Sequence, residues 1–246
     1  MVHREELDNY CNKFLCVKNF KDYGPNGLQI EGSDTIDKII SGVSANLDLI
    51  ERAIEENADA IFVHHGIFWD NESNLITGAK RKKIALLMNN NINLFGYHLP
   101  LDDHPEVGNN IELGRILGIK KMKPVEDSYL WQGELKTDLK SFSSLIEREL
   151  GRAPQLFGKM NKSINKIAWC TGGAQGFIDE AVKLKVDLYL SGEVSERTPS
   201  VAKENGITYI SAGHHATERY GVQSLCNHLC SKFKLQHQYI EVDNSV

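Results

Sequence analysis

The sequence lacks the features of a membrane-spanning, secreted or disulfide-linked protein. Its 246 residues contain no uninterrupted apolar run near the roughly 20 residues that a membrane-spanning helix needs. The first ten residues, MVHREELDNY, are too charged for a secretory signal peptide. The five cysteines are scattered, odd in number and without a CxxC pair, which argues against a disulfide framework. These absences predict reduced thiols and a cytoplasmic protein.

Acidic residues outnumber basic residues in this chain. The chain has 28 Lys and Arg against 33 Asp and Glu, a net charge of −5, so nucleic acid is an unlikely partner unless a local basic patch exists that the totals do not show. The sequence has no GxxxxGK[ST] loop, which excludes nucleotide binding of the P-loop type. With 41% hydrophobic and 25% charged residues, the composition is that of an ordinary globular protein and excludes a disordered chain.

What the sequence does contain is an internal repeat. Residues 38–66 and 166–194 align without a gap at an offset of 128. Each copy has the pattern of an apolar strand, a turn of small residues, an amphipathic helix and a second apolar strand. Because strands alternate with helices, the repeat predicts α/β units with largely parallel strands.

The alternation continues beyond the repeat. A helix over 80–89 precedes a strand over 92–97, and a helix over 197–205 precedes a strand over 207–212. The pattern breaks near 123–131. We therefore predict an α/β protein of two domains with a partial internal repeat, one domain over 1–125 and one over 126–246, leaving open that the C-terminal helix packs back on the first domain.

Chemically reactive side chains follow four of the predicted strands. In open α/β sheets, binding sites form at the carboxyl ends of strands, so this placement is unlike a random scatter of histidines. In chain order, the side chains are His64, His65, His98, Asp102, Glu193, His214 and Glu218.

Imidazole and carboxylate groups are natural ligands for zinc, manganese and iron, so these positions predict a metal site. His214 and Glu218 are four residues apart across a strand-to-helix junction and can face one site. Asp102 offers two oxygens and could bridge two ions. Three imidazoles and two carboxylates would leave open positions on two ions, as catalytic sites need. The predicted ligands are His64, His65, Asp102, His214 and Glu218.

Simpler interpretations remain open for single residues. A His-His pair is often accidental, Asp102 could cap a turn, and Glu218 could be an ordinary residue of a first helical turn. His98 could orient a ligand, transfer protons or fill the core. Glu193 could be a general acid or base, orient a ligand, or be a surface charge.

The strand-end segments also resemble a known family. FVHHGIFW, GYHLPLDDHPEVGNN, SGEVSERTPSVAKENGITYISAGHHATERYGVQSL and, from Asp22, DYGPNGLQIEG are similar to the motifs of the Nif-three-like dinuclear metal-binding proteins, often described as GTP cyclohydrolase I type 2 homologs. The resemblance covers almost the whole chain and is to the short bacterial form. It implies the Nif-three-like fold, the same five ligands, two divalent ions per subunit (Zn, Fe or Mn) and a toroidal homohexamer.

The resemblance implies a metal-dependent hydrolase that opens the guanine imidazole ring of GTP and releases formate toward 7,8-dihydroneopterin triphosphate. A bound metal lowers the pKa of water from 15.7 toward about 7, and Glu193 or His98 could transfer the protons. Two alternatives remain open: a metal-containing hexameric scaffold or binding protein without turnover of GTP, and a metal-dependent phosphoesterase or nucleotide hydrolase, because two-metal centres suit phosphoester chemistry.

Overall fold

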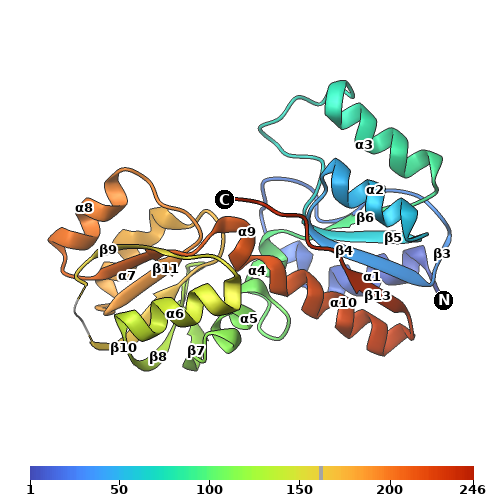
Figure 1. The fold of residues 1–246 in the computed structure, drawn as a ribbon. Helices are drawn as coiled ribbons and strands as arrows, with labels where there is room; N and C mark the ends of the chain where they lie inside the picture. The colour runs from blue at the N-terminus through green and yellow to red at the C-terminus, as the bar shows by residue number, and fades with distance from the viewer. Residues whose placement is uncertain (161–162) are drawn as a thin grey trace. The chain divides into compact units, whose positions relative to one another are not determined.

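The computed structural model describes residues 1–160 and 163–246, and the chain forms two compact units. The first unit consists of Met1–Gly108 and Gly221–Asp243, and the second of Asn109–Tyr220 and Asn244–Val246. Each unit has its own sheet with helices on both faces, which confirms the predicted α/β class (Figure 1). In the described part of the chain, no helix is long and apolar enough to cross a membrane.

The sheet of the first unit has five strands in the order β13-β4-β5-β6-β2. All neighbours are parallel except β6 and β2, which pair antiparallel. The central strands are almost wholly buried, as expected for parallel strands that are covered on both faces. The strands are β2 (Gly27–Ile30), β4 (Lys38–Ser44), β5 (Ala60–His65), β6 (Asn93–Gly96) and β13 (Gln236–Tyr239).

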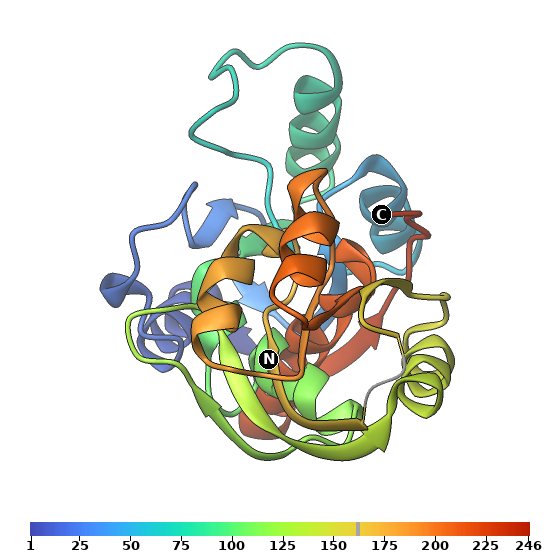
Figure 2. The same ribbon diagram turned by 90° about the vertical axis from the view of Figure 1, so that its left-hand side faces the viewer.

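Two pairs of helices enclose this sheet. Helices α1 (Arg4–Phe14) and α10 (Arg219–Phe233) pack on one face, and α2 (Leu47–Glu55) and α3 (Gly78–Asn89) on the other. A long loop joins β5 to α3 (Figure 2). The smaller elements of the unit are β1 (Val2–His3), η1 (Val17–Asn19), β3 (Thr35–Ile36) and α4 (Leu99–Asp103).

The sheet of the second unit has six strands in the order β7-β8-β10-β11-β12-β9. Its three middle strands, β10, β11 and β12, are parallel, like β4, β5 and β6 of the first unit, and each of the two sets has an antiparallel strand beside its last member. The strands are β7 (Lys120–Pro124), β8 (Trp131–Asp138), β9 (Gln155–Gly158), β10 (Ser163–Trp169), β11 (Leu188–Ser191) and β12 (Thr208–Ser211).

Helices cover both faces of the second sheet as well. Residues of α5, α6 and α9 share one core with Trp169, and residues of α7 and α8 share the other with Tyr189. The helices are α5 (Asn109–Ile116), α6 (Leu139–Leu150), η2 (Gln175–Phe177), α7 (Ile178–Lys183), α8 (Arg197–Glu204) and α9 (His214–Thr217).

The predicted repeat extends to individual hydrogen bonds. The Asp59 carboxylate accepts the backbone N–H groups of residues 37 and 38, at 2.8 and 2.9 Å. Asp187, 128 positions later, accepts those of residues 165 and 166, at 3.0 and 3.1 Å. Each aspartate directly precedes a strand and binds the backbone of the neighbouring first strand of its repeat, which explains its recurrence.

The observed division between the units differs from the predicted one at residues 125 and 126. Helix α5 and strand β7 belong to the second unit, because β7 pairs with β8 and Leu113 packs in the same core as Trp169. The chain returns to the first unit at Gly221, since Leu225 and Leu229 of α10 join the core around Leu7. The sequence pattern does not specify which core receives α5.

Candidate metal centre

Two adjacent histidines end the buried strand β5. Within a regular strand, neighbouring side chains point to opposite faces. At this strand end, however, the rings of His64 and His65 lie with their centroids 4.6 Å apart at an interplanar angle of 48°. Two imidazoles from consecutive residues are therefore available on the same side of the chain.

The Nδ1 nitrogen of each ring is held by a neighbouring segment, the end of β4 for His65 and the residue after β6 for His64. Nδ1 of His64 is 2.9 Å from the backbone oxygen of Tyr97, and Nδ1 of His65 is 2.9 Å from Oγ of Ser44. Metal-binding histidines typically use one nitrogen for the ion and the other for a hydrogen bond that fixes the ring. This arrangement leaves Nε2 of both rings for the ligand role.

A third histidine, His98, completes this group. Nδ1 of His98 lies 2.6 Å from Oδ1 of Asp22, and the possible ligand atoms of His64, His65 and His98 all lie within 4.8 Å of one another. Asn26 reinforces the contact, because its Oδ1 accepts the backbone N–H of His98 at 2.7 Å while its Nδ2 donates to Asp22 at 2.8 Å. The sequence assigned no role to Asp22 or Asn26, although both lie in the DYGPN segment.

Burial raises the pKa of the Asp22 carboxyl, but the hydrogen bonds from His98 and Asn26 and the charge of His98 outweigh it and leave the pKa below its ordinary value. Asp22 therefore stays ionised and holds the ring of His98 in one orientation.

Asp102 enters the same group from helix α4. The helix follows directly after His98, and the backbone N–H of Asp102 donates to the carbonyl of His98 at 3.1 Å. Oδ1 of Asp102 lies 3.4 Å from Nε2 of His64, and the residue is only 8% exposed. We call His64, His65, His98 and Asp102 the first-unit cluster.

In the second unit, His214 lies between two carboxylates. Strand β12 ends at Ser211, and His214 begins the short helix α9. Nδ1 of His214 is 2.6 Å from Oε1 of Glu193, which follows β11, and its Nε2 is 3.1 Å from Oε2 of the buried Glu218. We call His214, Glu218 and Glu193 the second-unit cluster. The second-unit cluster therefore brings together side chains that follow the ends of strands β11 and β12.

A glycine makes room for the second-unit cluster. Gly172 has a φ of +66°, and a Cβ at this position would lie 1.9 Å from Oε1 of Glu218. Thr217 fixes the segment, because its Oγ1 accepts the N–H of Gly172 at 3.0 Å and donates to the carbonyl of His214 at 2.9 Å. The sequence shows the small residues at 171–173 as a turn, but it gives no sign that they contact the cluster.

The two carboxylates change the acidity of His214. Burial lowers the pKa of the imidazole, but the hydrogen bonds and negative charges of Glu218 and Glu193 outweigh it and raise the pKa to about 9. The metal-free protein therefore carries a protonated His214 at neutral pH, and a metal ion would displace that proton.

This raised pKa predicts how the metal-free protein responds to pH. A pKa above the ordinary 6.5 of histidine means that the folded state binds the proton more tightly, so the stabilisation is complete below pH 6.5 and is lost as the pH rises through about 9. In the presence of a chelator, the free energy of unfolding should fall by up to about 3 kcal/mol over this range. Urea unfolding at several pH values measures it.

A His214→Gln variant provides the control, because it keeps a polar side chain and cannot titrate. Its free energy of unfolding should lack this part of the pH dependence. Equal pH dependence in the variant and the unaltered protein would contradict the assignment.

The side chains of both clusters fit a divalent ion with nitrogen and oxygen ligands. The histidines are oriented through one ring nitrogen, and Asp102 and Glu218 add buried carboxylate oxygens. Such donor sets suit zinc, iron and manganese. The structure thus contains groups of His, Asp and Glu side chains that could hold metal ions.

Comparisons with known proteins identify the family of this chain. The model of the Duf34/NIF3 (NGG1p interacting factor 3) family matches residues 2–245. A protein of Allochromatium vinosum named "GTP cyclohydrolase 1 type 2 homolog" is 46% identical over 248 residues, covering 99% of this chain and 98% of its own length. A counterpart from Pseudomonas aeruginosa with the same name is 46% identical over 98% of this chain and 96% of its own.

Solved structures give the same result. The structure described as "Structural genomics, protein ybgI, unknown function" is 42% identical with a TM-score of 0.96, and TTHA1606 from Thermus thermophilus is 31% identical with a TM-score of 0.92. Both comparisons cover 100% of each chain. The chain therefore belongs to the Duf34/NIF3 family.

Proposed function

We propose that this protein is a dinuclear metal-dependent hydrolase that opens the imidazole ring of GTP and releases formate. The observation that carries the proposal is the construction of the two clusters, in which each ligand imidazole is fixed through Nδ1 and faces its cluster with Nε2. The choice of GTP is supported by the names of the relatives, which are called homologs of GTP cyclohydrolase 1 type 2.

Five residues are the proposed metal ligands. Each set is already ordered within its own unit, His64, His65 and Asp102 in the first and His214 and Glu218 in the second. We propose two divalent ions per chain, which the mixed ligands allow to be zinc, iron or manganese. When bound, the ions would supply Lewis acidity and lower the pKa of a water molecule toward about 7.

The protein's own groups would handle the protons. In the proposed reaction, water adds at C8 of the guanine ring and opens it to a formamide, and a second water hydrolyses the formamide to release formate. His98 is suited to accept and return a proton at Nε2, because Asp22 holds Nδ1 at 2.6 Å and fixes the orientation of the ring. Glu193 contacts Nδ1 of His214 directly, which suits it to orienting that ligand as well as to proton transfer.

Replacing Glu193 with Gln separates these two roles. Gln keeps an oxygen that can accept from Nδ1 of His214 but loses the charge, so an orienting role predicts metal affinity and turnover that fall together by about 10- to 100-fold. Titration with a metal-sensitive dye, followed by assays at saturating metal, measures the two effects. Restoration of turnover at saturating metal would support orientation. A loss of kcat that persists at saturation would instead assign Glu193 as a general acid or base.

Incubation of GTP with protein reconstituted with zinc, manganese or iron(II) tests the reaction. We expect formate and a fluorescent pterin product, together with close to two ions per chain by elemental analysis. Turnover of other nucleotides or phosphoesters, but not of GTP, would support a phosphoesterase instead. Metal binding with no turnover of any substrate would support a scaffold protein, and failure to bind any of the three metals would refute the shared premise.

We also propose that the protein is cytoplasmic and that, as the family resemblance implies, the chain assembles with itself into a homohexamer. Light scattering of the purified protein should give six times the mass of one chain, and a monomeric mass at micromolar concentration would contradict the proposal.

A further inference from the structure

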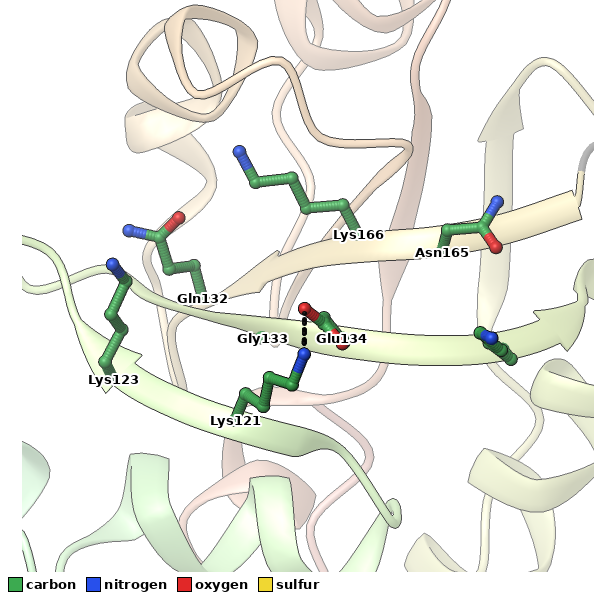
Figure 3. A pocket seen from close by; sticks show the side chains of 8 residues that line it. Lys121, Lys123, Gln132, Gly133, Glu134, Asn165 and Lys166 are labelled. Carbon is green, nitrogen blue, oxygen red and sulfur yellow. Dashed lines mark hydrogen bonds and ion pairs between the residues drawn. The ribbon is translucent and has the colours of Figure 1, made fainter.

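A basic depression lies on the second unit, on the outer strands of its sheet. Its volume is about 640 Å³, within the range of sites for small molecules. Side chains from three neighbouring strands surround it, and Figure 3 shows those of β7, β8 and β10 along its sides. The lining residues are Lys121, Lys123, Gln132, Gly133, Glu134, Lys136, Asn165 and Lys166. None of them belongs to the second-unit cluster.

Irregular strand pairing shapes this depression. The register between β7 and β8 shifts between Lys120 and Lys123. Lys121 has a φ of +50°, a left-handed backbone conformation that residues other than glycine rarely adopt. The register between β10 and β8 shifts as well, between Ile164 and Lys166. Such bulges bend a strand and redirect its side chains, and they often lie beside binding sites.

The charges around the depression are unbalanced. Lys121 forms an ion pair with Glu134 at 2.9 Å, and Lys166 donates to the backbone oxygen of Leu184 at 2.7 Å. Lys123 and Lys136 are exposed, and neither side chain forms an ion pair or hydrogen bond within residues 1–160 and 163–246. Four ammonium groups thus surround one carboxylate in a chain whose total charge is −5.

We propose that this depression binds an oligophosphate anion, either free or as the phosphate chain of a nucleotide. Lysine ammonium groups bind phosphate as point charges. Because neighbouring strands lie about 4.8 Å apart, lysines on three strands spread positive charge over roughly 10 Å, the scale of a few linked phosphates. The polar amides of Gln132 and Asn165 add possible hydrogen-bond donors.

The lining favours an oligophosphate over single-stranded nucleic acid. Sites for single strands combine basic residues with aromatic side chains on which bases stack, and none of the eight lining residues is aromatic. A carboxylate near the middle, Glu134, would also repel a continuous phosphate backbone. Binding at this depression is independent of the proposed hydrolase function, because none of the lining residues belongs to either cluster.

Calorimetric titration of the full chain with tripolyphosphate tests the proposal. The double variant Lys123→Gln with Lys136→Gln removes the two lysines whose side chains form no ion pair or hydrogen bond within residues 1–160 and 163–246. We expect it to bind tripolyphosphate about tenfold more weakly, as for the loss of two partly exposed ion pairs. The matched control is Lys140→Gln with Lys203→Gln, which changes the charge equally on exposed helix residues of the same unit outside the depression. It should bind within about twofold of the unaltered protein.

A gain of affinity excludes a purely structural explanation. Glu134→Gln removes the opposing charge, so we expect tripolyphosphate to bind about three times more tightly. The Asp102→Ala variant should still bind it, which keeps this result separate from the fate of the metal centre. Equal affinities for GTP, ATP and tripolyphosphate would place the contact on the phosphates.

Other results would overturn the proposal. Equal weakening by the control pair would mean that only overall charge matters, and equal binding of citrate would remove the preference for phosphate. Tighter binding of a short RNA than of tripolyphosphate would assign the depression to nucleic acid. Absence of tripolyphosphate binding at millimolar concentration would leave no oligophosphate site.

Discussion

Replacement of Asp102 by Asn should abolish metal retention and hydrolysis together while leaving the fold intact. Asn has the size of Asp but lacks its charge, and it cannot offer two anionic oxygens to metal ions. We expect metal affinity to fall at least about 100-fold and turnover at least about 10³-fold, because water without a metal ion keeps its pKa near 15.7. Elemental analysis after dialysis and the formate assay measure the two effects, and circular dichroism reports the fold.

The adjacent residue supplies a matched control for this substitution. Asp103→Asn makes the same change one position later in helix α4, and Asp103 lies outside the proposed ligand set. Its metal content and turnover should stay within about twofold of the unaltered protein. Turnover by Asp102→Asn in the absence of bound metal would contradict the metal-assisted mechanism, whatever the control showed.

The two clusters differ in how their histidines are supported. His64 is held by a neutral carbonyl of the neighbouring strand, whereas His214 is held by the carboxylate of Glu193. A carboxylate behind an imidazole makes the ring a stronger base and a stronger ligand. If both clusters bind metal, an ion held by His214 should be the more firmly bound of the two, and a chelator should remove the two ions in separate steps.

Sequence reasoning predicted the elements that depend on local pattern. The repeat, the parallel strands and the residues at their ends could be read directly, because the period of apolar residues and the spacing of turns are properties of short segments. The contact between His214 and Glu218 could be predicted for the same reason, since both lie within five consecutive residues.

Contacts between distant segments could not be read in this way. Asp22 reaches His98 across 76 positions, and Asn26 reaches it across 72. Their pairing depends on β2 lying antiparallel beside β6, which the alternation of strands and helices does not specify. For the same reason, the predicted first domain, 1–125, includes α5, whereas the structure places α5 in the second unit. Gly172 was missed because a glycine in a turn has many explanations, and only the position of Glu218 distinguishes them.

Replacement of Gly172 by Ala should disable the second-unit cluster, although it adds only one methyl group. In Gly172→Ala the new Cβ would lie 1.9 Å from Oε1 of Glu218 and 3.2 Å from Nε2 of His214, so the carboxylate must move away. The left-handed backbone adds a cost of about 1–2 kcal/mol for an alanine. We expect metal affinity to fall about 10- to 100-fold with a parallel loss of turnover, measured by metal titration and the formate assay.

Gly206→Ala separates the two causes. Gly206 has nearly the same backbone conformation, with a φ of +65° against +66° at Gly172. Among residues 1–160 and 163–246, however, no atom other than those of its chain neighbours lies within 4 Å of a Cβ placed there. Both variants should therefore lose about the same stability from backbone strain, while only Gly172→Ala should lose metal. If both variants kept their metal, Glu218 would be free to move without consequence and would not be a ligand. If both lost it, strain in the fold would explain the loss, and the close contact between residue 172 and the carboxylate would have no part in it.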